Sequence, residues 1–268
     1  MNVEHRYREF LPEARRVVVK IGTRVIAHPS GRPDMRPLKG LVRQIARLHR
    51  KGYELLVVSS GAIGAGMEAL GMTVRPTSVP DLQMCAAVGQ ARLMAHYEEL
   101  FDTEKITIGQ VLLTHADFQH RIRFTNAKRT LEHMIRRDVI PIINENDAVA
   151  DEEIKAGLSL GDNDYLAALV VKLVRADLLV ILSTVDGVLD AKNRRVACIE
   201  NLNEAFALVM PTEEGGLSKG GMDSKLRAAQ IAVRAGCSVV VACGRTPDVL
   251  TQVMEGCDTG TLILSSTL

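Results

Sequence analysis

The chain has 268 residues, of which 47% are hydrophobic and 24% are charged, and its formal net charge is +1. This composition is typical of a folded enzyme and excludes a mostly disordered chain. The balance of acids and bases, the aromatic content of 3% and the absence of Trp argue against a nucleic-acid-binding surface that stacks bases. The length predicts a single α/β domain over residues 1–268.

The cysteines and histidines form no metal-binding or disulfide pattern. The five cysteines are scattered without a C-x-x-C pair and predict reduced thiols, whereas the seven histidines lack ligand spacing and are expected to be structural. The charged N-terminus has no apolar signal core, and no run reaches the roughly 18 apolar residues that a membrane span needs. We therefore expect a cytoplasmic protein that binds neither membrane nor nucleic acid.

Taken in chain order, segments with strand and helix character alternate. The apolar runs that predict strands are nearly continuous, as in strands covered on both faces, and the segments between them have helical periodicity. The predicted order is strand 17–21, helix 38–49, strand 55–58, helix 82–101, strand 106–113, helix 124–136, strand 139–143, helix 165–174, strand 178–182, helix 225–235, strand 238–242, helix 247–254 and strand 261–264. This alternation predicts a mainly parallel sheet with helices on both faces, a three-layer αβα sandwich.

Glycine and polar residues follow the predicted strands, at the sheet edge where ligands of α/β proteins bind. The segment LVVSSGAIGAG at 56–66 indicates a buried strand followed by a turn whose bare backbone amides suit an anion or phosphate. It matches neither the Walker motif nor the dinucleotide fingerprint, and such turns also occur for packing alone. A second glycine-rich segment opens a helix at 220–225, so the two together suit a substrate with several anionic groups.

Two lysines and one aspartate are candidates for phosphoryl transfer. Lys20 closes an apolar strand, where a lysine is costly unless its ammonium meets an anion, although a snorkelling surface lysine is the alternative. Lys225 is equally consistent with an ordinary basic residue on a helix. Asp164 fits the N-cap of its helix, as does Asp162, but a carboxylate between two lysines would also hold both in position.

The segment Asn144-Glu145-Asn146-Asp147 directly follows a buried strand. Residues of these types form turns by default. Two amides and two carboxylates exceed what one turn needs, so they predict a site for the ammonium of a small zwitterion.

In this order and at these separations, the motifs VVVKIGTRV, VVSSGAIGAG, INENDAV, GDND, VDGV and GGMDSKL resemble the amino acid kinase family, and within it the kinases of glutamate. The resemblance runs from about Val17 to the C-terminus, and INENDAV and GGM-x-[ST]-K-L are its most specific motifs. AAVGQARLMAHYEELF and FTNAKRTL are also similar. Many bacterial members carry an RNA-modification-type (PUA) domain after the kinase domain, and we expect a short form without it.

The resemblance implies ATP-dependent phosphorylation of the γ-carboxylate of L-glutamate, the first step of proline synthesis, with Mg²⁺. It also implies feedback inhibition by proline and a homodimer or homotetramer. Lys20 and Lys225 would stabilise the transferring phosphoryl group, and Asp164 would organise the lysines. The residues implied for glutamate binding are Ser60, Gly61, Asn144, Asp147 and Asn163. Those implied for ATP binding are Lys20, Ser183, Thr184, Lys219, Gly220, Gly221, Met222, Asp223, Ser224 and Lys225.

The sequence departs from the family pattern at a few positions. Thr184 stands where Asp is usual, Leu189 where Tyr is usual, and His115 where Arg is common. The segment at 155–161 is longer than the usual connection to GDND.

Two alternatives to a glutamate kinase stay open. One is a kinase of the same fold that acts on acetylglutamate, aspartate or a carbamate, and the other is a catalytically silent member that binds nucleotide or an oxyanion without transfer. The presence of Lys20, Asp164 and Lys225 favours an enzyme, and the NEND segment favours glutamate as the acceptor.

Overall fold

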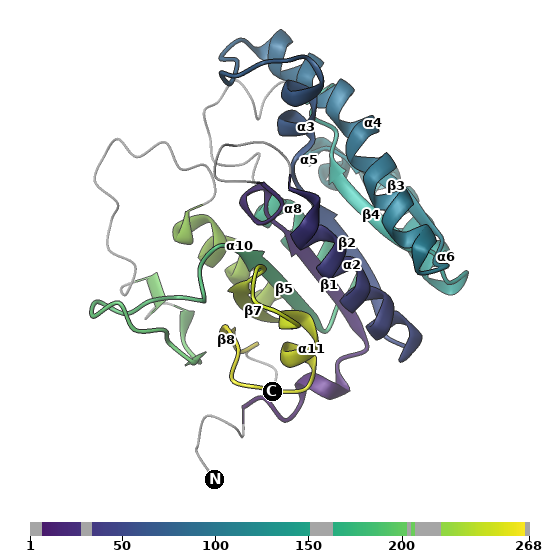
Figure 1. Cartoon of the computed structure of the whole chain (residues 1–268). Coiled ribbons are helices and arrows are strands. Elements are labelled where there is room, and N and C mark those ends of the chain that lie inside the picture. Colours follow the sequence, from purple (N-terminus) through teal and green to yellow (C-terminus); the bar gives the residue numbers. More distant parts are fainter. Residues whose placement is uncertain (1–6, 28–33, 151–162, 203–204, 207–220, 266–268) are drawn as a thin grey trace.

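A computed structural model of the chain describes residues 7–27, 34–150, 163–202, 205–206 and 221–265. Its strands form an eight-stranded sheet in the order β3-β4-β2-β1-β5-β7-β8-β6 (Figure 1). All neighbouring strands run parallel except β7 and β8, which are antiparallel. The strands are β1 (Arg16–Ile21), β2 (Glu54–Ser59), β3 (Ile108–Leu113), β4 (Ile140–Glu145), β5 (Leu178–Ser183), β6 (Cys198–Ile199), β7 (Ser238–Cys243) and β8 (Thr261–Ile263).

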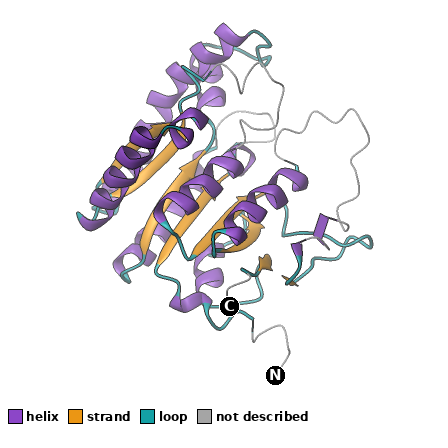
Figure 2. Ribbon diagram, turned by 180° about the vertical axis from the view of Figure 1, so that it is seen from behind, coloured by secondary structure: helices purple, strands orange, loops and turns teal. Residues whose placement is uncertain are grey.

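Helices cover both faces of this sheet (Figure 2). The α-helices are α2 (Met35–Arg50), α3 (Ala62–Ala69), α4 (Val79–Thr103), α5 (His115–Gln119), α6 (Arg121–Arg136), α8 (Asn163–Val174), α10 (Met222–Arg234) and α11 (Val249–Met254), and the 3₁₀ turns are η1 (Leu11–Glu13) and η2 (Thr23–Val25). One hydrophobic core includes side chains of α2, α4 and α11, and the other includes side chains of α6, α8 and α10. The predicted three-layer αβα sandwich is therefore confirmed.

The central strand β1 contributes to both cores by alternation. Val17, Val19 and Ile21 belong to the core on the α2 side, whereas Val18 belongs to the core on the α8 side. Successive side chains of a strand point to opposite faces, so Lys20 follows Val18 toward α8. This direction decides which partners the buried lysine can reach.

Every strand and helix predicted from the sequence is present, with shifted ends. The helix predicted at 82–101 begins at Val79, because the Ser78 side chain accepts from the backbone N–H of Asp81 and a proline occupies the first turn. The short elements α3, α5 and β6 had no sequence prediction. In α3 the glycines lower helix propensity, and packing on α4 compensates for them.

Two expectations about strands are wrong. Strand β3 is mostly half-exposed rather than covered on both faces, because it lies at the sheet edge beside β4 alone. Strand β4 continues through Glu145, so Asn144 and Glu145 are buried strand residues, and the turn begins after them. The register with β3, which pairs Leu112 with Asn144, extends the ladder to this point.

Helices α3 and α4 touch through glycines. A Cβ added at Gly89 would lie 1.7 Å from the carbonyl oxygen of Ala62, and one at Gly66 would lie 1.8 Å from that of Cys85. The interpretation of the glycine-rich segment as a bare phosphate-binding turn is therefore wrong for Gly66, which serves helix packing. Gly61 does meet a conformational need, since its φ of 113° lies in the left-handed region at the start of α3.

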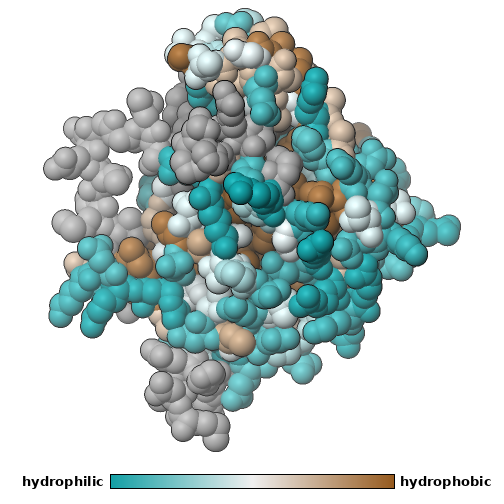
Figure 3. All heavy atoms as spheres, viewed as in Figure 1, coloured by the Kyte–Doolittle hydropathy of each residue, from teal (hydrophilic) through white to brown (hydrophobic). Residues whose placement is uncertain are grey.

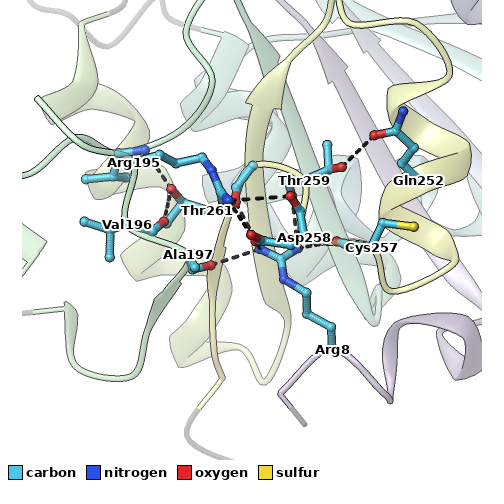
Figure 4. A network of polar contacts seen from close by, with 11 residues as sticks. Arg8, Arg195, Val196, Ala197, Gln252, Cys257, Asp258, Thr259 and Thr261 are labelled. Atoms are coloured by element: carbon cyan, nitrogen blue, oxygen red, sulfur yellow. Dashed lines mark hydrogen bonds and ion pairs between the residues drawn. The ribbon is translucent and has the colours of Figure 1, made fainter. Parts of the chain in front are cut away.

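Arg8 joins the N-terminal segment to the loop before β8 (Figure 4). Its side chain is 2% exposed and lies 3.6 Å from the carboxylate of Asp258. A buried guanidinium needs acceptors for its N–H groups, and backbone carbonyls supply them here. The guanidinium donates to the carbonyl oxygens of Cys257 at 3.1 Å, Thr259 at 2.9 Å, Ala197 at 2.9 Å and Gly260 at 3.0 Å.

The surface over α2 and α11 is largely hydrophilic, whereas apolar side chains gather over the connection between α3 and α4 (Figure 3). The exposed hydrophobic residues of this region are Leu70, Val74 and Met84. Within the described part of the chain, no helix has the length and apolar character required to cross a membrane.

The contact between α3 and α4 predicts that Gly89→Ala lowers the free energy of unfolding by about 3 kcal/mol, because the new methyl group meets backbone that cannot rotate away. Gly40→Ala is the matched control, since Gly40 lies on α2 with nothing within 4 Å of an added Cβ. That variant should gain up to about 1 kcal/mol from helix propensity. Urea-induced unfolding measures both, and equal stability of the two variants would contradict the contact.

Candidate active site

The carboxyl ends of the central parallel strands bring the predicted site residues to one edge of the sheet. Lys20 in β1 pairs with Val58 in β2 and with Ile181 in β5. Val58 in turn pairs with Ile143 in β4. The residues that follow these positions, which are Ser60, Asn144 and Ser183, therefore lie at the same edge as Lys20.

Lys20, Asp164 and Lys225 form a buried ion cluster at this edge. The Nζ atom of Lys20 lies 2.5 Å from Oδ1 of Asp164, and Nζ of Lys225 lies 3.1 Å from Oδ2. The side chain of Asp164 is fully buried, and the two lysine side chains are each 5% exposed. Asp164 therefore bridges two cations, as predicted, and the alternative of a snorkelling Lys20 does not describe this structure.

Three elements deliver these charges. Alternation along β1 turns Lys20 toward α8, where Asp164 is the second residue, and Lys225 lies in the first turns of α10. Burial raises the pKa of Asp164, but attraction to Lys20 and Lys225 outweighs burial, so this pKa lies below its ordinary value. Asp164 is thus an anion at neutral pH, and the cluster keeps an excess of one positive charge.

An amide cluster lies beside the ion cluster. The Nδ2 atom of Asn163 donates to Oγ of Ser60 at 2.8 Å and to Oδ1 of Asn144 at 3.1 Å. Asn144 also donates from Nδ2 to Oε1 of Gln90 at 2.7 Å. Because Asn163 immediately precedes Asp164, the first turn of α8 joins the amide cluster to the lysines.

The two remaining residues predicted for glutamate binding follow the ends of β2 and β4 along the chain. Gly61 follows Ser60 at the start of α3, where a Cβ would lie 3.1 Å from Cδ1 of Ile26. Asp147 is half-buried in the turn after β4. Its contact with an acceptor stays a prediction.

The residues predicted for nucleotide binding are divided between two segments. Ser183 ends β5 and Thr184 follows it in an exposed position. Gly221 is the N-cap of α10, whose first turn contains Met222, Asp223 and Ser224, and the Ser224 hydroxyl donates to the Gly221 carbonyl at 2.9 Å. Lys219 and Gly220 lie outside the described residues, as does the 155–161 segment.

Two residues that contact the candidate site or its neighbours were not identified from the sequence. Gln90 holds Asn144, and the hydroxyl of Tyr97 lies 2.8 Å from Oγ of Ser59, next to Ser60. Burial raises the pKa of Tyr97, so its hydroxyl stays protonated. Both residues lie in AAVGQARLMAHYEELF, a segment that is similar to the amino acid kinase family but contains no residue for which the sequence analysis predicted a role.

Comparison with known proteins identifies the family. The family described as Amino acid kinase family matches residues 15–243. The chain belongs to the amino acid kinase family.

Relatives within this amino acid kinase family carry a narrower name. Glutamate 5-kinase of Teredinibacter turnerae is 44% identical over 96% of this chain and 69% of the relative. Glutamate 5-kinase of Clostridium acetobutylicum is 40% identical over 98% of this chain and 98% of the relative. The amino acid kinase described here is therefore a phosphotransferase related to glutamate 5-kinases, and the predicted resemblance is confirmed.

A solved structure also shares the fold of this amino acid kinase. Carbamate kinase from Giardia lamblia bound to AMP-PNP has a TM-score of 0.64 and 19% identity, over 95% of this chain and all of that chain. At this identity the likeness supports the fold alone.

The structure shows the contacts of two residues that depart from the family pattern, His115 and Leu189. His115 begins α5, and its ring centroid lies 5.4 Å from that of Tyr165 on α8, next to Asp164. Leu189 is 38% exposed and forms a bridge with Arg195. Neither residue belongs to the cluster of Lys20, Asp164 and Lys225, so these departures leave its charges unchanged.

The ion cluster predicts a large effect of Asp164→Asn, which leaves two buried ammonium groups without an anion. The free energy of unfolding at pH 7 should fall by about 3–5 kcal/mol. Asp223→Asn is the control, because the Asp223 ion pair with Arg227 is exposed and should contribute less than about 1 kcal/mol. Similar losses in the two variants, measured by urea unfolding, would argue against a stabilising cluster.

The same cluster predicts the pH dependence of stability. The pKa of Asp164 is lowered in the folded state, so the unfolded chain binds a proton first as the pH falls. The contribution is complete above the unfolded value of about 3.9 and is lost as the pH falls from there through the folded pKa. The stability difference between wild type and Asp164→Asn should therefore shrink below about pH 4. A constant difference between pH 7 and pH 3 would contradict this assignment.

Proposed function

We infer that this amino acid kinase transfers the γ-phosphoryl group of ATP to the γ-carboxylate of L-glutamate, giving L-glutamyl 5-phosphate and ADP, the first step of proline synthesis. The observation that carries this inference is the buried Lys20–Asp164–Lys225 cluster beside the amides of Asn144 and Asn163. Relatives named glutamate 5-kinase, at 44% and 40% identity, support the choice of acceptor.

The chemistry requires alignment and charge neutralisation rather than a general base. A glutamate carboxylate has a reference pKa of about 4.3 and is already ionised at neutral pH. One of its oxygens forms a bond to the γ-phosphorus, while the bond from that phosphorus to the β–γ bridging oxygen breaks and its electron pair leaves with ADP. No proton needs to move in this step.

The lysines fit the charge that this transfer develops. Phosphoryl transfer spreads negative charge over the equatorial oxygens of the phosphoryl group, and preorganised cations stabilise that charge. Asp164 holds Lys20 and Lys225 at its two oxygens, which fixes the ammonium positions before substrates bind. In this proposal Lys20 and Lys225 contact the transferring group, and Asp164 is a positioning residue.

The two substrates approach from the two sides of the cluster. Glutamate would contact Ser60, Gly61, Asn144, Asp147 and Asn163, on the side of β2 and β4. ATP would contact Ser183 and Thr184 after β5 and the start of α10, from Lys219 to Lys225. The order of strands supports this division, because β1 lies between β2 and β5.

We also propose Mg²⁺ as the companion of ATP. Asp164 does not fit as its ligand, because both of its oxygens already face ammonium groups. Mg²⁺ keeps several waters and commonly binds through substrate phosphates, where it would neutralise charge on the β- and γ-oxygens.

The finer expectations belong to the same proposal. They are feedback inhibition by proline, assembly as a homodimer or homotetramer, and a cytoplasmic location, and the similarity to glutamate 5-kinases is what supports them.

An acceptor screen tests the function directly. With MgATP and hydroxylamine, the purified protein should form a trappable acyl phosphate from L-glutamate, with matching release of ADP. N-acetylglutamate, which lacks the free ammonium, and aspartate, whose side chain is one methylene shorter, should each react at least about tenfold more slowly. Preferential turnover of another acceptor would replace glutamate in the proposal, and nucleotide binding without any turnover would favour a silent member.

The division of roles predicts different defects in two variants. Lys20→Ala should abolish transfer, whereas Asp147→Ala should mainly raise the KM for glutamate, because only the lysine meets the transferring charge. Lys172→Ala on the exposed side of α8 is the control and should leave both constants unchanged. An equal loss of nucleotide affinity in Lys20→Ala and Asp147→Ala would sink the division.

A further inference from the structure

A backbone hydrogen bond fixes which end of each side-chain amide in the cluster carries the oxygen and which carries the nitrogen. The backbone N–H of Glu145 donates to Oδ1 of Asn144 at 2.9 Å. Because a backbone N–H can only donate, the oxygen of the Asn144 amide must face it, and the nitrogen must face the opposite side. Gln90 lies on that side and therefore presents its oxygen, Oε1, to Asn144 at 2.7 Å.

The same reasoning orients the other end of the cluster. Oδ1 of Asn144 accepts a bond from Nδ2 of Asn163, so the Asn163 amide presents its nitrogen to the cluster. That nitrogen uses its second hydrogen for Oγ of Ser60, which acts as the acceptor. The Ser60 hydroxyl hydrogen is then able to donate elsewhere.

Two buried atoms at the ends of this cluster have no hydrogen-bond partner among the residues that the structure describes. They are Nε2 of Gln90, which is a donor, and Oδ1 of Asn163, which is an acceptor. Buried polar atoms without partners cost free energy, so each such atom in a folded protein needs an explanation. A bound ligand that pairs with them would supply one.

The polarity of these atoms matches an amino acid. The Asn163 oxygen suits an ammonium, whereas the Gln90 amide nitrogen and the Ser60 hydroxyl suit carboxylate oxygens. We propose that Gln90 determines specificity through both ends of its amide: Oε1 fixes, through Asn144, the amide of Asn163 for the free ammonium of the acceptor, and Nε2 donates to a carboxylate of the same acceptor. This proposal rests on the proposed function and adds a specificity-determining residue to it.

Gln90 is well placed for such a role. It follows Gly89, whose contact with the backbone of Ala62 and Gly66 fixes the distance between α4 and α3. The same helix carries Tyr97, which contacts Ser59 beside Ser60. Helix α4 thus contacts both β4, through Asn144, and the end of β2, through Ser59.

The test is Gln90→Met, which keeps the length of the side chain and removes both hydrogen-bonding atoms. The KM for L-glutamate should rise about tenfold or more, with the KM for ATP unchanged and kcat within about threefold of wild type. Preference for L-glutamate over glutarate, which lacks the ammonium, should fall by a similar factor. Gln83→Met, two turns earlier on α4, is the matched control and should change none of these values.

A second variant tests the Nε2 donor while keeping the contact with Asn144. Gln90→Glu keeps an oxygen toward Asn144 and should keep the melting temperature of the wild type. It replaces the Nε2 donor by an anionic oxygen that repels a carboxylate. The KM for L-glutamate should therefore still rise by at least about tenfold, the effect expected from losing one hydrogen bond to a charged group. It therefore tests the proposal even where Gln90→Met does not fold.

The outcomes distinguish this proposal from the function on which it rests. Wild-type turnover of glutamate together with an unchanged glutamate KM in Gln90→Glu overturns the role of Gln90 and leaves the kinase activity intact. Absence of wild-type turnover, with turnover of a different acceptor, overturns the function itself and this role with it. A raised glutamate KM in Gln90→Glu with unchanged ATP KM supports both.

Discussion

The site depends on one interaction, the buried carboxylate of Asp164 held between the ammonium groups of Lys20 and Lys225. Charges this deeply buried are stable only when they are paired, so the cluster constrains three elements at once. Strand β1 must turn a side chain toward α8, and α8 and α10 must both begin at the carboxyl edge of the sheet. Separating any one of the three charges from the others would cost free energy, and this cost fixes the positions of β1, α8 and α10 relative to one another. In the proposed function, the transferring phosphoryl group would meet the excess positive charge that results.

The acceptor side follows from this arrangement, because Asn163 and Asp164 are neighbours in the first turn of α8. The residue that completes the lysine cluster therefore brings with it the amide that contacts Ser60 and Asn144. Behind these groups, the close contact between α3 and α4 sets the depth at which Gln90 can reach Asn144. Adjacent residues in one turn of α4 thus have different contacts: Gly89 packs on α3, and Gln90 accepts from Asn144, the contact on which the proposed recognition of the acceptor rests.

Much of the site was predictable because its residue types are costly anywhere else. A lysine at the end of an apolar strand requires an anion, and this requirement alone identified Lys20. The amides of the NEND segment were identified as polar groups beyond the needs of a turn, although Asn144 proved to lie inside β4. Gln90 and Tyr97 escaped notice because a polar residue on a long helix ordinarily faces solvent, and nothing in the local pattern marks the one that faces a strand. Gly66 was misinterpreted for a similar reason, since a glycine required by packing and one required by a phosphate look alike in sequence.

The sequence by itself determined the alternation of strands and helices, the mainly parallel sheet, the family and most of the charged site residues. The alternation and the sheet follow from hydrophobic periodicity, a local property of the chain, whereas the family follows from the resemblance of its motifs. Only the tertiary structure decided that Asp164 bridges both lysines rather than merely capping a helix, and that Gln90 and Glu145 orient Asn144. Those contacts join residues far apart in the chain, and their geometry depends on strand order and helix packing, which periodicity does not encode.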